Sequence, residues 1–217
     1  MNQALHHYEA EPRIFSISGF NFALREPPGY SYDAFFFHRS CSIGWGTWKD
    51  RWEKADWLVT DYASFCNDKD QQRGFNRGGN DLSGMLDMQM AGRIDSWAIR
   101  WDYTHFKQDA LALHSTRPRV YHIGSDGSGT NTRRGSFRQS PLTRERKSEF
   151  HFPPDVQIEP DLAAELHRQL RPPVARRFVR WLRRTRWALS PPQSARPQSP
   201  KSRPSKPDGE EFENPSP

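Results

Sequence analysis

Residues 39–52 read Arg39-Ser-Cys-Ser-Ile-Gly-Trp-Gly-Thr-Trp-Lys-Asp-Arg-Trp52, and residues 77–85 read Arg77-Gly-Gly-Asn-Asp-Leu-Ser-Gly-Met85. The first stretch combines glycines, three indole rings and alternating charges, and the second places a carboxylate where a helix is expected to begin. Glycine lets the backbone turn sharply and approach a ligand closely, and flat aromatic faces suit the apolar side of a sugar ring. The two stretches together predict a ligand-binding loop followed by a helix.

The flanking sequence predicts short strands and short helices in alternation. Residues 13–19 alternate apolar and small polar side chains, and the three consecutive phenylalanines within 34–38 indicate a strand buried on both faces. Asn80 is expected to cap a helix over 81–90 that stops at Gly92. Segment 95–103 fits either a helix or a strand. Further helices are expected at 2–9, 49–56, 61–70 and 159–170, and further extended segments at 110–114 and 119–123.

Composition narrows the class of protein. The chain has 217 residues, a net charge of +6 and 34% hydrophobic residues, with the polar residues concentrated after residue 130. The basic residues lie mainly in the C-terminal third, apart from the tryptophan-rich stretch, whereas proteins that bind single-stranded nucleic acid interleave the two. We therefore expect no nucleic-acid partner.

Cysteine usage and hydropathy predict the compartment. Cys41 and Cys66 lack the spacing of a zinc site and are expected to be reduced thiols. No signal peptide is apparent, and no apolar run approaches the roughly 20 residues that span a bilayer. The expected location is the cytoplasm, and peripheral attachment to the inner face of the cell membrane is the alternative.

The C-terminal third differs in character from the rest. We expect a globular region over 1–152, basic amphipathic helices over 153–189 and a disordered tail over 190–217. Within 174–189, apolar residues share one helical face and arginines occupy the remainder. Such a helix suits an anionic membrane surface; the alternative is an ordinary helix docked on the domain with a solvated basic face.

Five motifs occur in an order that points to a family: Ile14-Phe-Ser-Ile-Ser-Gly-Phe-Asn21, Gly44-Trp-Gly-Thr-Trp48, Gly78-Gly-Asn-Asp-Leu82, Asp95-Ser-Trp-Ala-Ile-Arg100 and Ile123-Gly-Ser-Asp-Gly-Ser-Gly-Thr130. Together they resemble the C-terminal half of bacterial sugar transferases of the GT-A superfamily, which are glycosyltransferase family 2-like. These are distantly similar to the Golgi N-acetylglucosaminyltransferase that starts complex N-glycans. The resemblance covers residues 1–152. It implies an α/β, Rossmann-like fold and transfer of a sugar from a nucleotide-sugar to a saccharide or lipid-linked acceptor in cell-surface polysaccharide synthesis.

The resemblance also implies a missing half. Family members bind the nucleotide-sugar in their N-terminal half, where an Asp-x-Asp type cluster holds Mn²⁺ or Mg²⁺. That cluster lies just before the helix that residues 1–8 resemble, so we expect this chain alone to bind no metal and to be inactive. A late start codon, a frameshifted gene and a genuine short product all remain open. The alternative function is a non-catalytic sugar- or membrane-associated remnant.

Asp81 is the candidate catalytic residue. It matches the second acid of the family's Gly-Gly-Asp-Asp-Leu pattern, with Asn80 in place of the first. An inverting transferase needs a base for the acceptor hydroxyl, and the resemblance implies that Asp81 is that base. The alternative is a carboxylate at a helix N-terminus with only a capping role.

The resemblance implies that Gly44, Trp45 and Gly46 line the donor-sugar and acceptor side of the cleft. Trp45 stacks on a sugar in this interpretation, and the alternative is that it fills the core beside Phe36. For the other nearby tryptophans we expect a place in the core or in a surface groove, because large aromatic side chains mostly serve packing. These are Trp48, Trp52 and Trp57.

Residues 124–130 resemble the family's lid over the donor, which makes Asp126 a candidate substrate contact; an exposed surface loop is the alternative. His122 is a candidate contact for a diphosphate or a metal, although a lone histidine more often packs or faces solvent. Three basic residues are candidate contacts for a diphosphate or an acidic sugar. The alternative is that they are solvated, as single basic residues usually are. They are Arg77, Arg100 and Lys107.

Overall fold

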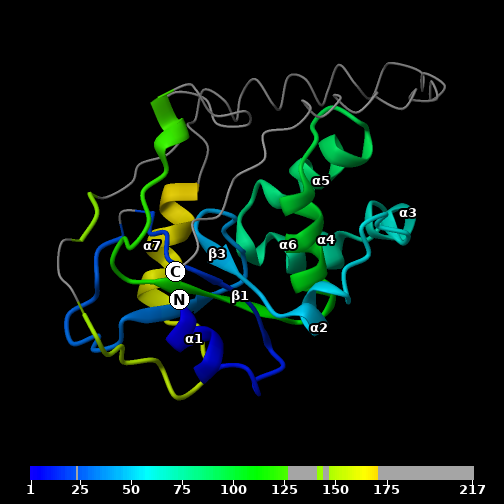
Figure 1. Cartoon of the computed structure of the whole chain (residues 1–217). Coiled ribbons are helices and arrows are strands. Elements are labelled where there is room, and N and C mark those ends of the chain that lie inside the picture. Colours follow the sequence, from blue (N-terminus) through cyan, green and yellow to red (C-terminus); the bar gives the residue numbers. More distant parts are fainter. Residues whose placement is uncertain (23, 127–140, 144–146, 171–217) are drawn as a thin grey trace, which may run out of the picture. The chain divides into compact units, whose positions relative to one another are not determined.

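The computed structural model describes residues 1–22, 24–126, 141–143 and 147–170, all of which belong to one compact unit (Figure 1). A second unit, from Val174 to Pro217, lies outside the described residues. The expected basic helix over 174–189 and the expected disordered tail over 190–217 fall in that second unit and stay predictions.

A four-stranded mixed sheet, with strand order β2-β4-β1-β3, forms the centre of a mixed α/β fold. β1 and β4 are parallel, whereas β2 pairs antiparallel with β4, and β3 antiparallel with β1. The three strands predicted over 13–19, 34–38 and 110–114 are confirmed, and all four residues of β2 are buried as expected. The strands are β1 (Ile14–Ser18), β2 (Ala34–Phe37), β3 (Trp45–Gly46) and β4 (Leu111–Ser115).

A bulge interrupts the alternation expected for β1. Ile14 pairs with Leu111 and Ser16 with Ala112, so two residues of β1 advance against one of β4. The extra residue, Phe15, reverses the side-chain alternation beyond it. Ile14 and Ile17 consequently join the same core cluster, and Phe15 joins another.

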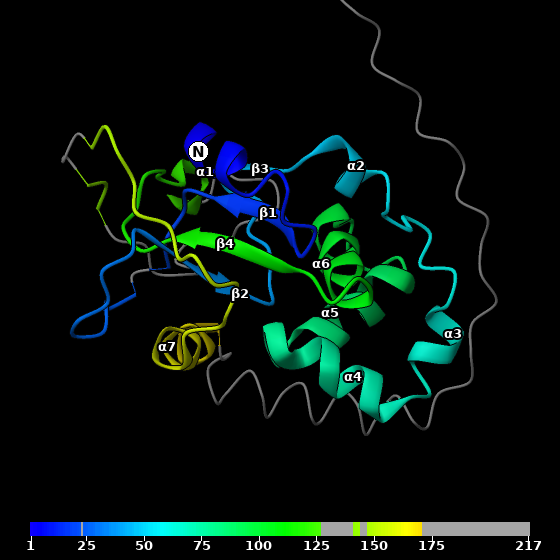
Figure 2. The same ribbon diagram turned by 90° about the horizontal axis from the view of Figure 1, so that it is seen from below.

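The two faces of the sheet have different covers (Figure 2). Helix α1 (Asn2–His7) and the segment around Phe152 pack on the face that carries Ile14, Ile17 and Phe36. On the other face, α7 (Pro160–Leu170) packs its leucines against β2. The helices predicted over 2–9 and 159–170 are confirmed, and the second of them belongs to the same compact unit as the sheet.

The chain between β3 and β4 is helical and forms its own core cluster. The helix predicted over 61–70 is wrong: the chain forms two helices, because the Asp68 carboxylate accepts hydrogen bonds from the amides of Asp70 and Gln71 and starts a new helix. Residues 97–103 of the segment expected over 95–103 lie in a helix rather than a strand. The elements are α2 (Lys49–Trp52), α3 (Tyr62–Phe65), α4 (Lys69–Phe75), η1 (Asn76–Gly78), α5 (Leu82–Met90) and α6 (Trp97–Lys107).

Three further local expectations can be compared with the structure. Residues 44–46, expected as a loop, contribute the short strand β3 because Trp45 and Gly46 pair with the end of β1. Segment 119–123 is not a strand, and it leads into the 3₁₀-helix η2 (Ile123–Asp126). Gly92 ends α5 as predicted, with φ of +65°. Within the described residues, no helix is both long enough and apolar enough to cross a membrane.

Candidate functional site

Asp81 occupies the N-cap position of α5, where Asn80 was expected, but its side chain makes no hydrogen bond to the helix amides. Asp81 thus lies at the helix N-terminus, as the capping alternative states, but it does not cap the helix through a side-chain hydrogen bond. Its carboxylate instead faces the guanidinium of Arg39: Oδ1 accepts a hydrogen bond from Nη1 at 2.9 Å. No described residue donates a hydrogen bond to Oδ2, and the side chain is 21% exposed. One carboxylate oxygen is thus fixed and the other is open.

The glycine step before α5 makes room for this ion pair. Gly79 has a φ of +145°, which L side chains rarely adopt. A Cβ at Gly79 would lie 2.7 Å from Asp81 Oδ1 and 2.9 Å from Arg39 Nη1. The sequence indicated the Gly78–Gly79 pair only as a break in the chain. In the structure Gly79 makes room for the two charged groups, and Gly78 for the side chain of Leu82 and the carbonyl of His38.

Contacts from three elements hold Arg39 and the residue after it in place. His114 of β4 donates from Nε2 to the Arg39 carbonyl oxygen at 2.8 Å, since that oxygen can only accept. The next amide, that of Ser40, donates to Asp102 Oδ1 of α6 at 2.7 Å. Asp81 adds a contact from the start of α5. Three elements, β4, α5 and α6, therefore meet at the residues that follow β2. We call Arg39, Asp81 and Asp102 the carboxylate–arginine cluster.

Burial shifts the protonation equilibria of this cluster. It raises the pKa of Asp102 to about 6, although the positive charge of Arg39 opposes the rise. Burial works to lower the pKa of Arg39, but the two carboxylates outweigh it and the pKa is raised. The pKa of His114 falls to about 4, chiefly through burial. The net charge of the cluster therefore changes just below neutral pH, at Asp102.

A second group of side chains, the indole cluster, contains five tryptophans. Trp45 stacks on Trp97 with ring centroids 5.3 Å apart, and Trp52 lies 4.4 Å from Trp57. Trp101 is fully buried and touches Trp45, Trp52 and Trp57. The alternative for Trp45, a place in the core, is confirmed except for its neighbour: Trp45 packs against the core cluster of Phe15 and Trp101, whereas Phe36 belongs to the core on the α1 side of the sheet.

Polar side chains support the base of the indole cluster. The indole N–H of Trp101 donates to Ser16 Oγ at 2.8 Å, and the same hydroxyl lies 2.8 Å from His105 Nε2. Burial lowers the pKa of His105 to about 3, so the imidazole is neutral at pH 7. The bulge at Phe15 is what turns Ser16 toward α6.

Sequence reasoning missed Trp97 and Trp101, although one signal pointed to them. They are four residues apart on α6 and therefore share a face of that helix. It also grouped Trp48 with Trp52 and Trp57, whereas Trp48 packs in the α1-side core, with the Arg51 guanidinium 4.4 Å from its ring.

Gly44 and Gly46 both face side chains of this chain, but only Gly44 is in a position where a larger residue would clash. Gly44 has a φ of +52°, and a Cβ there would lie 2.4 Å from Val120 Cγ2. A Cβ at Gly46 would lie 3.4 Å from Leu5. Close packing around β3 therefore requires glycine at position 44 but not at position 46, while Trp45 between them contributes to the indole cluster.

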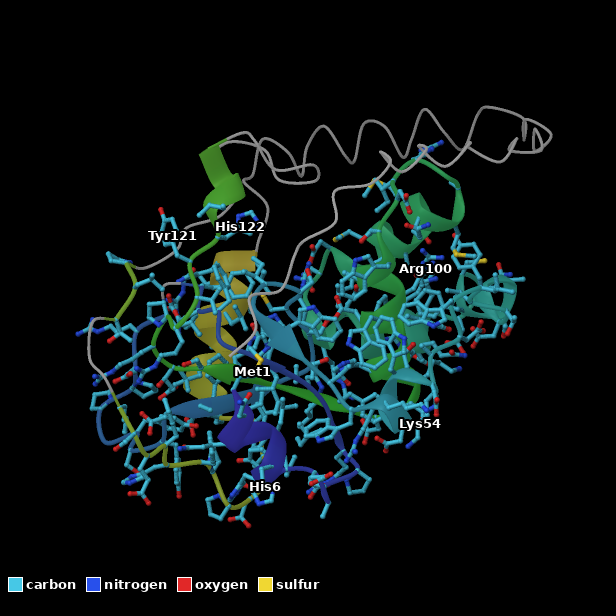
Figure 3. All side chains as sticks on the ribbon, viewed as in Figure 1. Met1, His6, Lys54, Arg100, Tyr121 and His122 are labelled. Carbon is cyan, nitrogen blue, oxygen red and sulfur yellow. The ribbon has the colours of Figure 1, made fainter. Side chains whose placement is uncertain are left out.

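Of the remaining candidates, Arg100 reaches the indole cluster through the backbone of Trp57, and the others that the structure describes lie elsewhere. Figure 3 places His122 in the segment before η2, apart from Arg100 of α6. The side chain of Asp126 and residues 127–130 lie outside the described residues. The three basic candidates are engaged within the chain. Arg77 bonds to Asp109 at 3.2 Å, Arg100 to the Trp57 carbonyl at 3.0 Å and Lys107 to Asp61 at 2.8 Å.

A cavity of about 220 Å³ lies at the carboxyl ends of β1 and β4, the edge where open α/β sheets usually bind ligands. Asp33 in its wall accepts hydrogen bonds from Lys147 Nζ at 2.6 Å and from the His151 amide at 2.8 Å. Although burial opposes the shift, the hydrogen bond from Lys147 lowers the pKa of Asp33. This carboxylate is thus committed to the chain itself. The sequence offered no signal for the cavity, because segments more than 100 residues apart enclose it.

The metal implied by the resemblance does not fit the described residues. Within them, no three carboxylate, imidazole or thiol groups converge as a metal site requires. We derive no step through Mn²⁺ or Mg²⁺.

Comparison of the chain with models of protein families, with curated proteins and with solved structures finds no match. The chemistry of the site must therefore be argued from the two clusters. A fixed carboxylate with one open oxygen can accept a proton from a hydroxyl group. A partly exposed array of indole rings can hold an amphipathic ligand such as a sugar.

Proposed function

We propose that this chain forms the acceptor side of a GT-A type glycosyltransferase, which transfers a sugar from a nucleotide-sugar to a saccharide or lipid-linked acceptor in cell-surface polysaccharide synthesis. The observation that supports this most directly is the arrangement of Asp81. Its Oδ1 is held by Arg39 at 2.9 Å, while no described residue bonds to Oδ2. A general base requires a carboxylate held in one position with a free oxygen toward the substrate.

In the proposed reaction, Asp81 Oδ2 accepts the proton of the acceptor hydroxyl as the hydroxyl oxygen attacks the anomeric carbon. The bond between that carbon and the diphosphate oxygen of the donor breaks in the same step, and the nucleoside diphosphate leaves with the bonding electrons. Arg39 is a positioning residue, because its guanidinium restricts the rotamer of Asp81 and does not need to touch the acceptor. The Asp102 bond to the Ser40 amide at 2.7 Å holds the backbone beside Arg39 in turn. Binding of the donor diphosphate is assigned to the half that the resemblance places upstream.

The first test is the DNA upstream of the Met1 codon. An in-frame sequence encoding a strand and an Asp-x-Asp cluster supports the proposal, and the extended protein should then release nucleoside diphosphate from a nucleotide-sugar in the presence of Mn²⁺ and saccharide acceptors. A stop codon or frame break supports the alternative function, a non-catalytic sugar- or membrane-associated module.

The second test is Asp81→Asn in the extended protein. It should lower kcat by about a hundredfold or more, the range for a positioned general base, and leave donor affinity nearly unchanged. Asp87→Asn is the matched control, because Asp87 lies on the same helix and bonds to the exposed hydroxyl of Tyr62 at 3.0 Å. A normal rate for Asp81→Asn would exclude the catalytic role.

A further inference from the structure

The indole cluster has a buried base and an exposed rim. Trp101 at the base is fully buried, whereas Trp97 is 39% exposed and Trp52 is 37% exposed. The two exposed rings lie 6.0 Å apart at an interplanar angle of 66°, so their faces form a corner. Trp45 stacks behind Trp97 at 28° and fixes the orientation of that ring.

The rim also offers hydrogen-bond donors. In the described part of the chain, no residue accepts a hydrogen bond from the indole N–H groups of Trp45, Trp52, Trp57 or Trp97, whereas that of Trp101 bonds to Ser16. Indole N–H groups normally find a partner when they are removed from water. A ligand that covers the rim must therefore combine an apolar face with hydrogen-bond acceptors. A sugar ring meets both needs through its C–H groups and its hydroxyl oxygens.

The size of the rim argues against a second copy of the chain. Trp52 and Trp97 together expose roughly 200 Å², taking the full surface of a tryptophan as about 250 Å². A stable protein interface needs about 800 Å² from each partner. The rim area instead matches a short saccharide.

The charges around the rim favour a neutral ligand. Asp50 pairs with Arg51 at 2.9 Å, and Lys49 pairs with Glu53 at 3.7 Å. Asp56, in the turn that follows α2, accepts hydrogen bonds from the amide and the hydroxyl of Thr60 at 2.6 and 2.7 Å. These ion pairs and hydrogen bonds are internal to the chain, so this side of the rim presents no concentrated charge of one sign to an ionic ligand.

We infer that Trp52 and Trp97, supported by Trp45, form a stacking subsite for a neutral oligosaccharide. The inference deepens the proposed function, since the identification of the bound saccharide as the acceptor rests on that function. The binding itself requires neither donor, metal nor turnover.

The test is a titration of the full 217-residue chain with neutral tetrasaccharides of glucose, mannose and N-acetylglucosamine. Tryptophan fluorescence and calorimetry measure binding during the titration. At least one of them should bind saturably. Trp52→Ala and Trp97→Ala should each lower its association constant tenfold or more. Trp97→Phe, which keeps a ring but loses the N–H group, should bind with intermediate affinity.

Trp48→Phe is the matched control, because Trp48 lies outside the indole cluster. The affinity of this variant for the saccharide should equal that of the unchanged protein. Circular dichroism confirms that each variant is folded. The inference is overturned if none of the three sugars binds, or if both rim variants bind normally. Self-association or vesicle binding that is lost in Trp97→Ala, without saccharide binding, would assign the rim to another partner. A failed transferase assay with intact saccharide binding would contradict only the proposed function.

Discussion

The carboxylate–arginine cluster and the indole cluster both use α6, yet they are stabilised in different ways. Asp102 and Trp101 are neighbours in sequence, and each supports a different cluster. In the first cluster, buried charges and hydrogen bonds make every member depend on the others. In the second, a buried base carries rings that are more than a third exposed. The difference shows that Asp102 and the base of the indole cluster belong to the folded core, whereas Asp81 and the indole rim are partly exposed.

The sharpest test of this contrast is Arg39→Met. It removes the cation beside Asp102, which is 5% exposed, and leaves a buried carboxyl group without its counter-charge. The free energy of unfolding should fall by about 3 kcal/mol, because the partly exposed ion pair with Asp81 and the charge that stabilises the buried Asp102 carboxylate are lost together. Urea unfolding at pH 7.5 measures this. Adding Asp102→Asn should recover part of the loss, and a loss below about 1 kcal/mol for Arg39→Met would show that the cluster is not a structural unit.

Trp101→Phe tests the base of the indole cluster. The change leaves a cavity and removes the hydrogen bond from Nε1 to Ser16 at 2.8 Å. We expect a loss of about 2 kcal/mol in unfolding free energy, from the lost volume and the lost donor together. Urea unfolding at pH 7.5 measures the loss. Trp48→Phe is the control, and its unfolding free energy should fall by less. Equal losses for the two variants would contradict the special position of Trp101.

The pH dependence of stability should report on two buried histidines: His105, beside the indole cluster, and His114, beside the carboxylate–arginine cluster. The folded-state pKa is about 3 for His105 and about 4 for His114, below the ordinary value of 6.5. The unfolded chain therefore binds more protons, and stability falls as the pH drops below 6.5, by about 1.4 kcal/mol per pH unit for each histidine at most. Asp102 opposes this below pH 6, because its raised pKa gives a contribution to stability that is present at low pH and lost as the pH rises through about 6.

Unfolding curves between pH 7.5 and 4.5 measure this slope. His105→Asn and His114→Asn should each reduce it, whereas His6→Gln should not, because the His6 side chain is 91% exposed. A stability that is independent of pH over this range would contradict the burial of both imidazoles in neutral form.

The smallest effect is expected for the rim. Trp97→Ala should lower the unfolding free energy by less than about 1 kcal/mol, since the ring is 39% exposed and stands at the first position of α6. Thermal unfolding of Trp97→Ala and Trp101→Phe under the same conditions compares the two losses of stability. A loss as large as that of Trp101→Phe would mean that the rim is part of the core, and would weaken the case for a ligand there.

The candidate site was predictable in part. The motif around Asp81 was recognisable because it is contiguous, and its glycines and carboxylate lie within a few residues. Arg39 was quoted in the sequence but not linked to Asp81, since 42 residues separate them and no local pattern reveals an ion pair. Asp102 was missed for the same reason. The role of Asp81 as a base stays a prediction.

The sequence by itself determined the mixed α/β class, β1, β2 and β4, the helices at both ends of the described region and the stop of α5 at Gly92. These follow from the periodicity of side chains and from the backbone freedom of glycine, which act over a few residues. Only the tertiary structure decided the bulge at Phe15, the convergence of three elements on Arg39, and the assembly of five indole rings into a base and a rim. Their members come from distant segments, and the packing of α6 against the sheet determines which of them meet.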